Sequence, residues 1–321
     1  MLALLSAGLA ATPLRGEPLA EETEHLIACT LVCPPSVREV PVFEQQRECE
    51  ECKGTYHYRL WLPKGYHSAP HRRWPCLFVA SGGGNPKMGP MARWLKANGY
   101  IVVMLVESRN GPWAPIIGNF LAAHDDVVRR FRVGEGMKFA TGMSGGARAA
   151  SMFVQIRSGF CGLILQGAGY AMDNQGRYYT ERLRQQPSLF VAMTIGRNDF
   201  NHTEVDRVKT LLPPNRFLLL EFDGGHQWAP SDVFEQAIGW IEQRVYHDPP
   251  TYPMLRPIYL ARFAVLADRF QAAATPAERL QAAEAALTYA RQRNIAADPS
   301  VATSFAALHA ELAKLRAESS R

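Results

Sequence analysis

The chain has 321 residues, of which 47% are hydrophobic and 20% are charged. This length and composition are typical of a globular protein with one large domain and an appendage, and they exclude a fibrous or largely disordered chain. The formal net charge of +5 at pH 7 comes from Lys and Arg residues that are scattered along the chain. A nucleic-acid-binding protein would concentrate them in a basic stripe, so we predict no nucleic-acid partner. No apolar run reaches the roughly 18 residues that a membrane-spanning helix needs.

The N-terminus carries an apolar stretch at residues 2–11 that is rich in small residues. Within it, Gly8-Leu9-Ala10 has the small-x-small form of a signal-peptide cleavage site, although no Lys or Arg precedes the stretch. We therefore interpret residues 1–22 as either a signal peptide or an N-terminal extension. A signal peptide predicts a secreted or periplasmic protein, and a plain extension predicts a cytoplasmic one.

Residues 23–54 form a segment that carries four of the six cysteines. They are Cys29, Cys33, Cys49 and Cys52. Their C-x3-C and C-x2-C spacings fit two disulfides, a structural zinc site or free thiols. The even number of cysteines and the signal-like start favour disulfides. Cys76 and Cys161 lie in apolar, strand-like runs, where buried and unreactive thiols are expected.

Residues 55–248 alternate between strand-like and helix-like patterns. Strands are predicted at 56–62, 75–80, 100–106, 137–143, 162–166, 189–195 and 216–222, and helices at 88–98, 119–132, 145–157 and 232–246. This alternation predicts an α/β domain with a mostly parallel central sheet and helices on both faces. Open α/β sheets bind ligands at the carboxyl ends of their strands, so polar residues that follow a strand are candidates for a site.

Residues 249–321 begin as a proline-rich linker and continue as an Ala- and Leu-rich helical extension. Thr275-Pro276-Ala277-Glu278 is a capping box with proline at the first helical position, and Asp298-Pro299 repeats the start of a helix. These patterns predict two or three helices. We expect them to pack as a small bundle or on the preceding domain, with binding of a partner as the alternative.

Gly142-Met143-Ser144-Gly145-Gly146 fits the pattern G-x-S-x-G, with an apolar strand before it and helix-forming residues after it. In that context the serine sits in a strained turn, and the small neighbours leave its Oγ exposed. The N-terminus of the following helix offers backbone N–H groups to an anion. We predict Ser144 as a catalytic nucleophile, with a structural glycine-rich turn as the alternative.

A serine hydroxyl needs a base that accepts its proton and a carboxylate that orients the base. Asp199 follows the strand at 189–195 and His226 follows the strand at 216–222, and we predict them as the acid and the base. For the acid, Asp173 and Glu107 are alternatives at strand ends, and Asp223 is interpreted as a turn former. The other histidines weighed, which are interpreted as surface, helix or packed residues, are His124, His202, His247 and His309.

Backbone N–H groups are needed to stabilise the negative oxygen that forms during acyl transfer. Gly145 directly follows the nucleophile, and the loop Ser81-Gly82-Gly83-Gly84 follows the strand at 75–80. We predict Gly83 and Gly145 as the two donors of an oxyanion hole, with Gly82 as the alternative to Gly83. The other interpretation of the glycine loop is a flexible turn.

Together with Gly196-Arg197-Asn198-Asp199 and Gly225-His226-Gln227-Trp228, these motifs resemble the α/β-hydrolase superfamily, whose triad runs in the same chain order. The resemblance covers roughly residues 55 to 246. Within the superfamily the chain is similar to the esterase branch of polyhydroxybutyrate-depolymerase-like proteins, feruloyl esterases and dienelactone-hydrolase-like enzymes. The resemblance implies an α/β-hydrolase fold and a serine esterase. Ser81 departs from it, because the oxyanion loop of the family often begins with His-Gly.

The predicted activity is hydrolysis of a carboxylic ester, small or carbohydrate-linked, through an acyl-enzyme and with no metal or organic cofactor. One alternative is a serine peptidase of the prolyl-oligopeptidase-like type, against which the lack of a propeller-sized extra domain speaks. The other is a non-catalytic binding protein on the same scaffold. The candidate substrate-binding residues are Asn85, Tyr170, Phe200 and Trp228, together with Trp113, and each of them could belong to the core instead.

Overall fold

The computed structural model describes residues 18–33, 35–247, 256–292, 295–296 and 298–319. The signal-like stretch at 2–11 and the prolines at 249, 250 and 253 lie outside these residues. None of the helices in the described ranges combines the length and the apolar character needed to cross a membrane.

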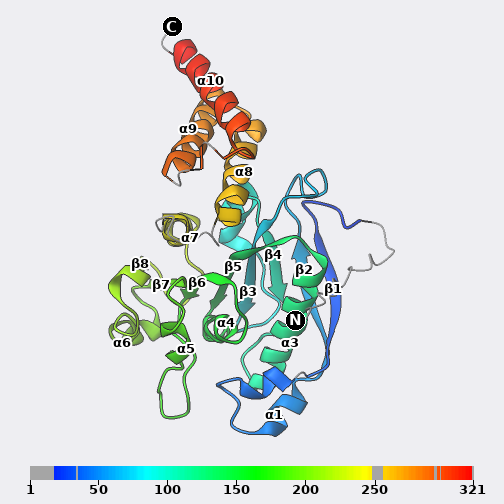
Figure 1. Cartoon of the computed structure of the whole chain (residues 1–321). Helices are drawn as coiled ribbons and strands as arrows, with labels where there is room; N and C mark the ends of the chain where they lie inside the picture. Colours follow the sequence, from blue (N-terminus) through cyan, green and yellow to red (C-terminus); the bar gives the residue numbers. More distant parts are fainter. Residues whose placement is uncertain (1–17, 34, 248–255, 293–294, 297, 320–321) are drawn as a thin grey trace, which may run out of the picture.

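A mixed sheet of eight strands runs through the molecule in the order β1-β2-β4-β3-β5-β6-β7-β8 (Figure 1). The strands are β1 (Glu24–Leu31), β2 (Gly54–Trp61), β3 (Trp74–Ser81), β4 (Ile101–Leu105), β5 (Val133–Met143), β6 (Phe160–Gln166), β7 (Phe190–Gly196) and β8 (Phe217–Phe222). The strand β2 pairs antiparallel with β1 and β4, and all other neighbours are parallel. The structure confirms the mostly parallel sheet, and the strand order is that of the α/β-hydrolase fold.

The sequence pattern predicts no strand in the cysteine-bearing segment, yet β1 lies there. It pairs with β2 over its whole length, from Glu24 opposite Trp61 to Leu31 opposite Gly54. Only one face of this edge strand is buried, but its exposed face carries Leu26, which is 59% exposed. Apolar residues on both faces obscure the alternation from which a half-buried strand is recognised. Part of this segment therefore belongs to the central sheet.

Helices cover both faces of the sheet, as predicted. The helices α1 (Gln46–Glu51), α3 (Trp113–Arg130) and α4 (Gly145–Ile156) enclose one core, and α2 (Ala92–Ala97) and α7 (Ser231–His247) enclose the other. Shorter helices in the loops are η1 (Pro35–Glu39), η2 (Gly89–Met91), α5 (Glu181–Arg184), η3 (Phe200–Glu204), α6 (Val205–Val208) and η4 (Pro214–Arg216). Residues of β3 alternate between the two cores, with Phe78 in the first and Leu77 and Val79 in the second. This is the pattern of a strand buried on both faces.

The helix α3 begins at Trp113 rather than at residue 119. Pro115 lies in its first turn, where a missing N–H costs no hydrogen bond because the first N–H groups of a helix have no partner within it. The helix can therefore begin before Pro115 without losing a hydrogen bond.

Three helices form the C-terminal extension: α8 (Arg256–Ala272), α9 (Pro276–Gln292) and α10 (Ala302–Ser319). Figure 1 shows α8 against the α/β domain and α9 and α10 projecting away from it. Arg262 of α8 donates to Glu242 of α7 at 2.5 Å, with both side chains buried, and Phe263 joins the core on that face. The predicted capping box is present, because Glu278 N–H binds Thr275 Oγ1 at 3.2 Å and Thr275 N–H binds Glu278 Oε2 at 3.0 Å. At least α8 packs on the domain, as expected.

Candidate active site

Ser144 stands between the end of β5 and the first residue of α4. Its backbone has φ 59° and ψ −125°, a region that side-chain-bearing residues rarely adopt and that stores strain. The neighbouring glycines make the turn possible. A Cβ on Gly142 would lie 2.1 Å from the carbonyl oxygen of Gly146, and a Cβ on Gly146 would lie 2.5 Å from that of Ala80. The strained turn that the G-x-S-x-G pattern predicts around Ser144 is present.

Asp199 and His226 lie side by side after β7 and β8. The Nδ1 atom of His226 is 2.9 Å from Oδ2 and 3.0 Å from Oδ1 of Asp199. The carboxylate is completely buried, while 24% of the His226 side chain is exposed. Asp199 also accepts the backbone N–H of Asn201 at 2.8 Å, which fixes the carboxylate at the start of η3. A buried carboxylate that orients a partly exposed imidazole is the arrangement of a general base and its partner.

The end of β6 joins these loops, a role that the sequence analysis does not predict. The carbonyl oxygen of Gln166 accepts the N–H of Ser144 at 2.9 Å, and its side-chain Oε1 accepts the N–H of Ala229, three residues after His226, at 3.2 Å. The next carbonyl, of Gly167, accepts from Asn201 Nδ2 at 2.7 Å. Gln166 is 0% exposed. A polar residue at the end of an otherwise apolar strand is the sequence feature that could have indicated it.

No hydrogen bond joins Ser144 Oγ to His226 in the part of the chain that the structure describes. Nucleophile and base are often further apart before substrate binds than during the reaction. Ser144 and Ala229, which lies three residues after His226, both bond to Gln166, so the two loops lie at the same end of the sheet.

Two backbone N–H groups near Ser144 are available to an anion. Gly145 is the first residue of α4, so its N–H has no partner in the helix, and the described residues offer it no other acceptor. In the glycine loop, Gly82 N–H binds the Met143 carbonyl at 3.1 Å and Gly84 N–H binds the Ser81 carbonyl at 2.8 Å. Among the described residues, the N–H of Gly83 donates only to the Ser81 hydroxyl, at 3.3 Å. This difference favours Gly83 over Gly82 as an oxyanion donor.

The candidate substrate-binding residues have different surroundings. Phe200 is 70% exposed, and its ring centroid lies 4.1 Å from that of His226. Asn85 is exposed and accepts a hydrogen bond from Arg59 Nε at 2.9 Å. Trp228 is half-buried against the core under α7.

Tyr170 is fully buried, and Trp113 is half-buried. Tyr170 is 0% exposed and its ring packs 6.1 Å from that of Tyr178, so it has no surface for a substrate in this structure. Trp113 starts α3 and packs against the core on that face. Tyr170 therefore belongs to the core, and Trp113 packs at the edge of it.

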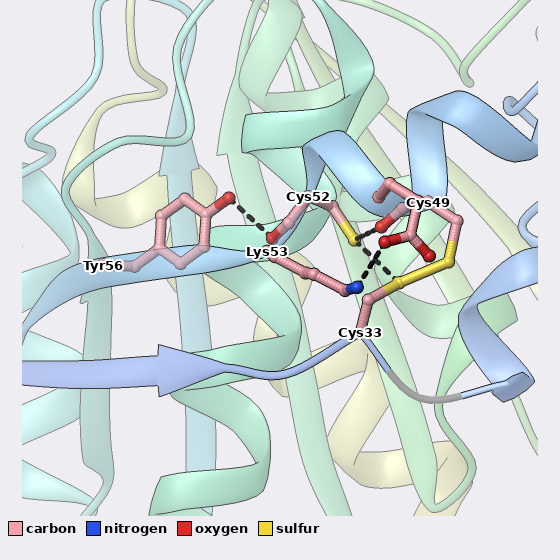
Figure 2. Close-up of a disulfide and its surroundings, with 6 residues drawn as sticks. Cys33, Cys49, Cys52, Lys53 and Tyr56 are labelled. Carbon is pink, nitrogen blue, oxygen red and sulfur yellow. Dashed lines mark hydrogen bonds and ion pairs between the residues drawn. A yellow bond between two sulfur atoms is a disulfide. The ribbon is translucent and has the colours of Figure 1, made fainter.

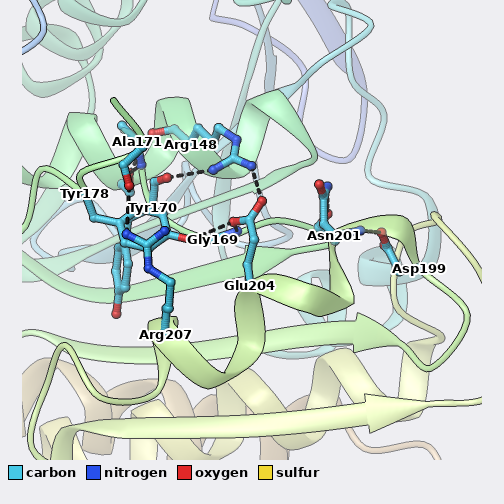
Figure 3. A network of polar contacts seen from close by, with 12 residues as sticks. Arg148, Gly169, Tyr170, Ala171, Tyr178, Asp199, Asn201, Glu204 and Arg207 are labelled. Atoms are coloured by element: carbon cyan, nitrogen blue, oxygen red, sulfur yellow. Dashed lines mark hydrogen bonds and ion pairs between the residues drawn. The ribbon is translucent and has the colours of Figure 1, made fainter. Parts of the chain in front are cut away.

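A polar network ties the loop after Asp199 to α4 (Figure 3). The Glu204 carboxylate binds the Arg148 guanidinium, the N–H of Gly169 at 3.2 Å and the hydroxyl of Tyr178 at 3.0 Å. Arg148 also donates to the Tyr170 carbonyl at 2.9 Å. The ion pair is only 21% and 15% exposed. The network therefore holds the loop after Asp199 against the helix that follows Ser144.

The competing acids occupy other places. Asp223 is 94% exposed at its side chain and pairs with Arg197, and Asp173 closes a turn with backbone N–H groups two and four residues further on. Glu107 binds the backbone N–H of His57 at 2.9 Å and its ring at 2.8 Å. None of the three acids bonds to the His226 ring in the described ranges.

His124 is a buried histidine of α3, 5% exposed, at a distance from the site in sequence and in its contacts. Its Nδ1 lies 2.8 Å from Asp125 Oδ1 and its Nε2 lies 2.8 Å from Lys138 Nζ. Burial lowers the pKa of His124 to about 4 and also lowers the pKa of Lys138. The imidazole is therefore neutral, donating from Nδ1 to the carboxylate and accepting the lysine proton at Nε2.

The cysteine-bearing segment contains one disulfide, between Cys33 and Cys49 (Figure 2). Cys52 stays a thiol 3.4 Å from Cys33 Sγ and donates to the Cys49 carbonyl at 2.9 Å. Cys29 is also a free buried thiol, as are the two strand cysteines 76 and 161. Burial raises the pKa of Cys52 to about 11 and that of Cys29 to about 12. The prediction of two disulfides in this segment is therefore only half right, because one disulfide is present and Cys29 and Cys52 are free thiols.

Within the described residues, the sulfurs of Cys33, Cys49 and Cys52 form a group that could hold a metal ion, since all three lie within 4.8 Å of one another. Two of the three sulfurs are bonded to each other.

A cavity of about 530 Å³ lies elsewhere, lined by the start of β6 and β7 with Phe160 and Phe190 and by Arg157 at the end of α4. No residue of the Ser144, Asp199 and His226 set lines it, so it does not mark this site.

Solved structures resemble the chain, whereas no protein-family model and no curated protein matches it. A ferulic acid esterase superposes with a TM-score of 0.50 at 14% identity, covering 70% of this chain and 100% of that chain. A fluorophosphonate-binding serine hydrolase of Staphylococcus aureus gives a TM-score of 0.48 at 13% identity, covering 68% and 98%. An S-formylglutathione hydrolase of Agrobacterium tumefaciens gives 0.46 at 12% identity, covering 69% and 95%.

At such identities the comparison shows the fold alone. The chain has the α/β-hydrolase fold with three further helices, and it is structurally similar to α/β-hydrolase esterases at low sequence identity.

Proposed function

We propose that the protein is a serine hydrolase that cleaves a carboxylic ester with Ser144 as nucleophile, His226 as general base and Asp199 as the orienting acid. The observation that carries the proposal is the buried Asp199 carboxylate on His226 Nδ1, at the same sheet end as the strained turn of Ser144. The backbone of Ser144 is strained. Strained residues persist only where the surrounding structure holds them in place, and they are found most often at functional sites.

In the proposed reaction, His226 Nε2 accepts the Ser144 hydroxyl proton as Oγ attacks the acyl carbonyl. Asp199 keeps the imidazole in the tautomer with a proton on Nδ1 and stabilises the imidazolium that forms. The imidazolium then protonates the leaving alcohol. Water repeats the sequence on the acyl-enzyme, and Ser144 is released with the acid product.

The oxyanion of each tetrahedral intermediate is held by the N–H groups of Gly145 and Gly83 in this proposal. Both donors are free or weakly bonded in the structure, so binding the oxyanion breaks no strong hydrogen bond. Phe200 forms an exposed apolar wall beside His226, which suits the apolar part of a small or carbohydrate-linked ester.

A fluorophosphonate probe tests the nucleophile, because it phosphonylates an activated serine and leaves ordinary serines unmodified. We expect stoichiometric labelling of the protein, complete loss of labelling in Ser144→Ala, and unchanged labelling in Ser158→Ala, an exposed serine after α4. An unlabelled parent protein would contradict the enzyme proposal. Labelling that survives Ser144→Ala would place the nucleophile elsewhere.

A substrate panel tests the bond that is cleaved. p-Nitrophenyl esters of increasing acyl length and feruloyl esters are compared with a peptide p-nitroanilide under the same conditions. We expect hydrolysis of at least one ester and none of the anilide. Faster cleavage of the anilide would replace the esterase by a peptidase with the same triad.

Export is part of the proposal, since residues 2–11 resemble a signal peptide. The disulfide between Cys33 and Cys49 supports it, because disulfides persist mainly in oxidising compartments. A fusion of residues 1–22 to a reporter that is active only outside the cytoplasm tests this, and an inactive reporter would favour a cytoplasmic protein.

A further inference from the structure

Asn110 lies in the loop after β4 and is joined to the glycine loop by backbone pairing. Its N–H donates to the Gly82 carbonyl at 2.9 Å, and the preceding residue, Arg109, forms an antiparallel bridge with Gly83. The segment around Asn110 therefore runs alongside the residues that carry the proposed oxyanion donor Gly83.

The Asn110 side chain lies between Gly145, a proposed oxyanion donor, and Gly82, the residue before the other proposed donor, Gly83. A Cβ on Gly145 would be 1.7 Å from Asn110 Oδ1 and 2.8 Å from its Cγ. A Cβ on Gly82 would be 3.0 Å from Oδ1 and 3.1 Å from Nδ2. The amide thus packs directly against the Cα of Gly145 on one side and against Gly82 on the other. In this arrangement the Asn110 amide occupies the space that a side chain at residue 145 would take.

The amide of Asn110 is not committed to any other partner. Within the described residues its Oδ1 and Nδ2 make no hydrogen bond, and the residue is exposed to solvent. A side chain that only fastened two loops together would be expected to bond to one of them. The two ends of an amide are nearly equal in size, so a half-turn about Cβ–Cγ brings the Nδ2 donors to the place that Oδ1 occupies.

We propose that Asn110 is a third donor of the oxyanion hole, in which its Nδ2–H joins the N–H groups of Gly145 and Gly83 on the substrate oxyanion. The inference rests on the proposed function and extends it by one residue. An amide is suited to this task, since it supplies a hydrogen-bond donor without a charge.

The test compares Asn110→Leu, which keeps the branch at Cγ but has no donor, with Asn110→Asp, which keeps the shape but replaces the donor by an acceptor. For the best ester of the panel we expect kcat to fall about 100-fold in Asn110→Leu with KM within threefold. In Asn110→Asp the loss is larger, and its activity relative to Asn110→Leu rises as the pH is lowered and the new carboxylate is neutralised. Arg109→Leu is the matched control, because its side chain lies against Gly84 instead of Gly145, and we expect its kcat within threefold of the parent.

The melting temperature separates a donor from a structural residue. We expect both Asn110 variants to melt within about 3 °C of the parent while fluorophosphonate labelling of Ser144 slows markedly. A kcat within threefold of the parent in Asn110→Leu would overturn the inference, as would equal losses in Asn110→Leu and Arg109→Leu. If the parent protein itself neither reacts with the probe nor cleaves an ester, the proposed function has failed, whatever the variants do.

Discussion

The carboxylate of Asp199 holds His226 with both of its oxygens, at 2.9 and 3.0 Å from Nδ1, and does so without any exposure to solvent. An ionised carboxylate accepts hydrogen bonds and does not donate them, so the proton of the neutral imidazole resides on Nδ1. The Nε2 atom is then the free acceptor of the ring. This is the tautomer that a general base for Ser144 requires.

We therefore expect the substitution Asp199→Asn to lower the rate of catalysis. The amide can present an N–H to Nδ1, which moves the imidazole proton to Nε2 and removes the acceptor. We expect kcat to fall about 10³- to 10⁴-fold with little change in KM, since the interaction matters most in the transition state. Steady-state hydrolysis of a p-nitrophenyl ester measures both constants.

Asp223→Asn is the matched control, because Asp223 lies three residues before His226 but is exposed and bonded to Arg197. We expect its kcat to stay within threefold of the parent. Equal losses in the two variants, or an Asp199→Asn enzyme with more than a tenth of parental kcat, would contradict the assignment of the acid.

Local patterns were enough to predict the residues that meet at this end of the sheet. Ser144 is recognised from its glycine neighbours, and Asp199 and His226 from their positions after apolar strands, because each depends on a few adjacent residues. The parallel order of the strands then brings the three loops to one edge. The predicted strands differ from the observed ones by only a few residues for the same reason.

Features that depend on contacts between distant segments were not predicted. Gln166 joins the Ser144 turn to the loop after His226, and Asn110 packs on Gly145, but neither role leaves a pattern in the adjacent sequence. Tyr170 is a substrate-binding candidate in the sequence because it is an aromatic residue near the loops of the site, but its side chain is buried, with its ring 6.1 Å from that of Tyr178. Sequence position locates a loop, whereas packing decides which side chains reach its surface.

Phe200 is expected to contribute to substrate binding rather than to stability. It is 70% exposed, so Phe200→Ala removes little buried surface and should leave the melting temperature unchanged within about 1 °C. Loss of the apolar wall beside His226 should raise KM for aromatic or long-chain esters about 3- to 10-fold. Acetyl esters, which are too short to cover the ring, provide the internal control. An equal rise in KM for both ester classes would argue against a contact with the substrate.

The ion pair of Glu204 and Arg148 should be coupled energetically, because both groups are largely shielded from water. We expect a double-mutant cycle of Glu204→Gln and Arg148→Met to give a coupling free energy of unfolding of at least about 1 kcal/mol. The loop that bears Asp199 is anchored through this pair, so Glu204→Gln should also lower kcat more than it raises KM.

The exposed pair of Asp206 and Lys209, in the neighbouring helix α6, is the control for that cycle. Its side chains are 88% and 49% exposed, and screening by water limits such a pair to a few tenths of a kcal/mol. Chemical denaturation of the two sets of variants yields both coupling energies. A Glu204–Arg148 coupling no larger than that of the exposed pair would show that the network does not hold the loop.

The disulfide should contribute strongly to stability, because it closes a loop with a sequence separation of 16. We expect Cys33→Ser to lower the free energy of unfolding by about 3 kcal/mol. Cys49→Ser should cost less under oxidising conditions, since Cys52 Sγ lies 3.4 Å from Cys33 Sγ and can pair with it. Urea denaturation with and without a thiol reductant measures both, and Cys76→Ser is the control for loss of a buried thiol. Equal losses in Cys33→Ser and Cys49→Ser would exclude the substitute pairing.

Because His124 is buried, we expect the free energy of unfolding to decrease in mild acid. In the folded protein burial holds its pKa at about 4, whereas an exposed histidine titrates near 6.5. Between these pH values the unfolded chain binds a proton that the folded protein does not bind, so the free energy of unfolding decreases as the pH falls. The contribution is fully present above pH 6.5 and amounts to about 3 kcal/mol, which is lost by about pH 4.

His124→Gln removes this titration and keeps an amide that can donate to Asp125 and accept from Lys138. We expect a flatter dependence of unfolding free energy on pH between 4 and 6.5 than in the parent, even if the variant is less stable at pH 7. His309→Gln, at an exposed position of α10, should keep the slope of the parent. Urea denaturation at half-unit pH steps gives the slopes. Because the slope reports the difference in bound protons, an unchanged slope in His124→Gln would mean that the buried imidazole is protonated in the folded protein.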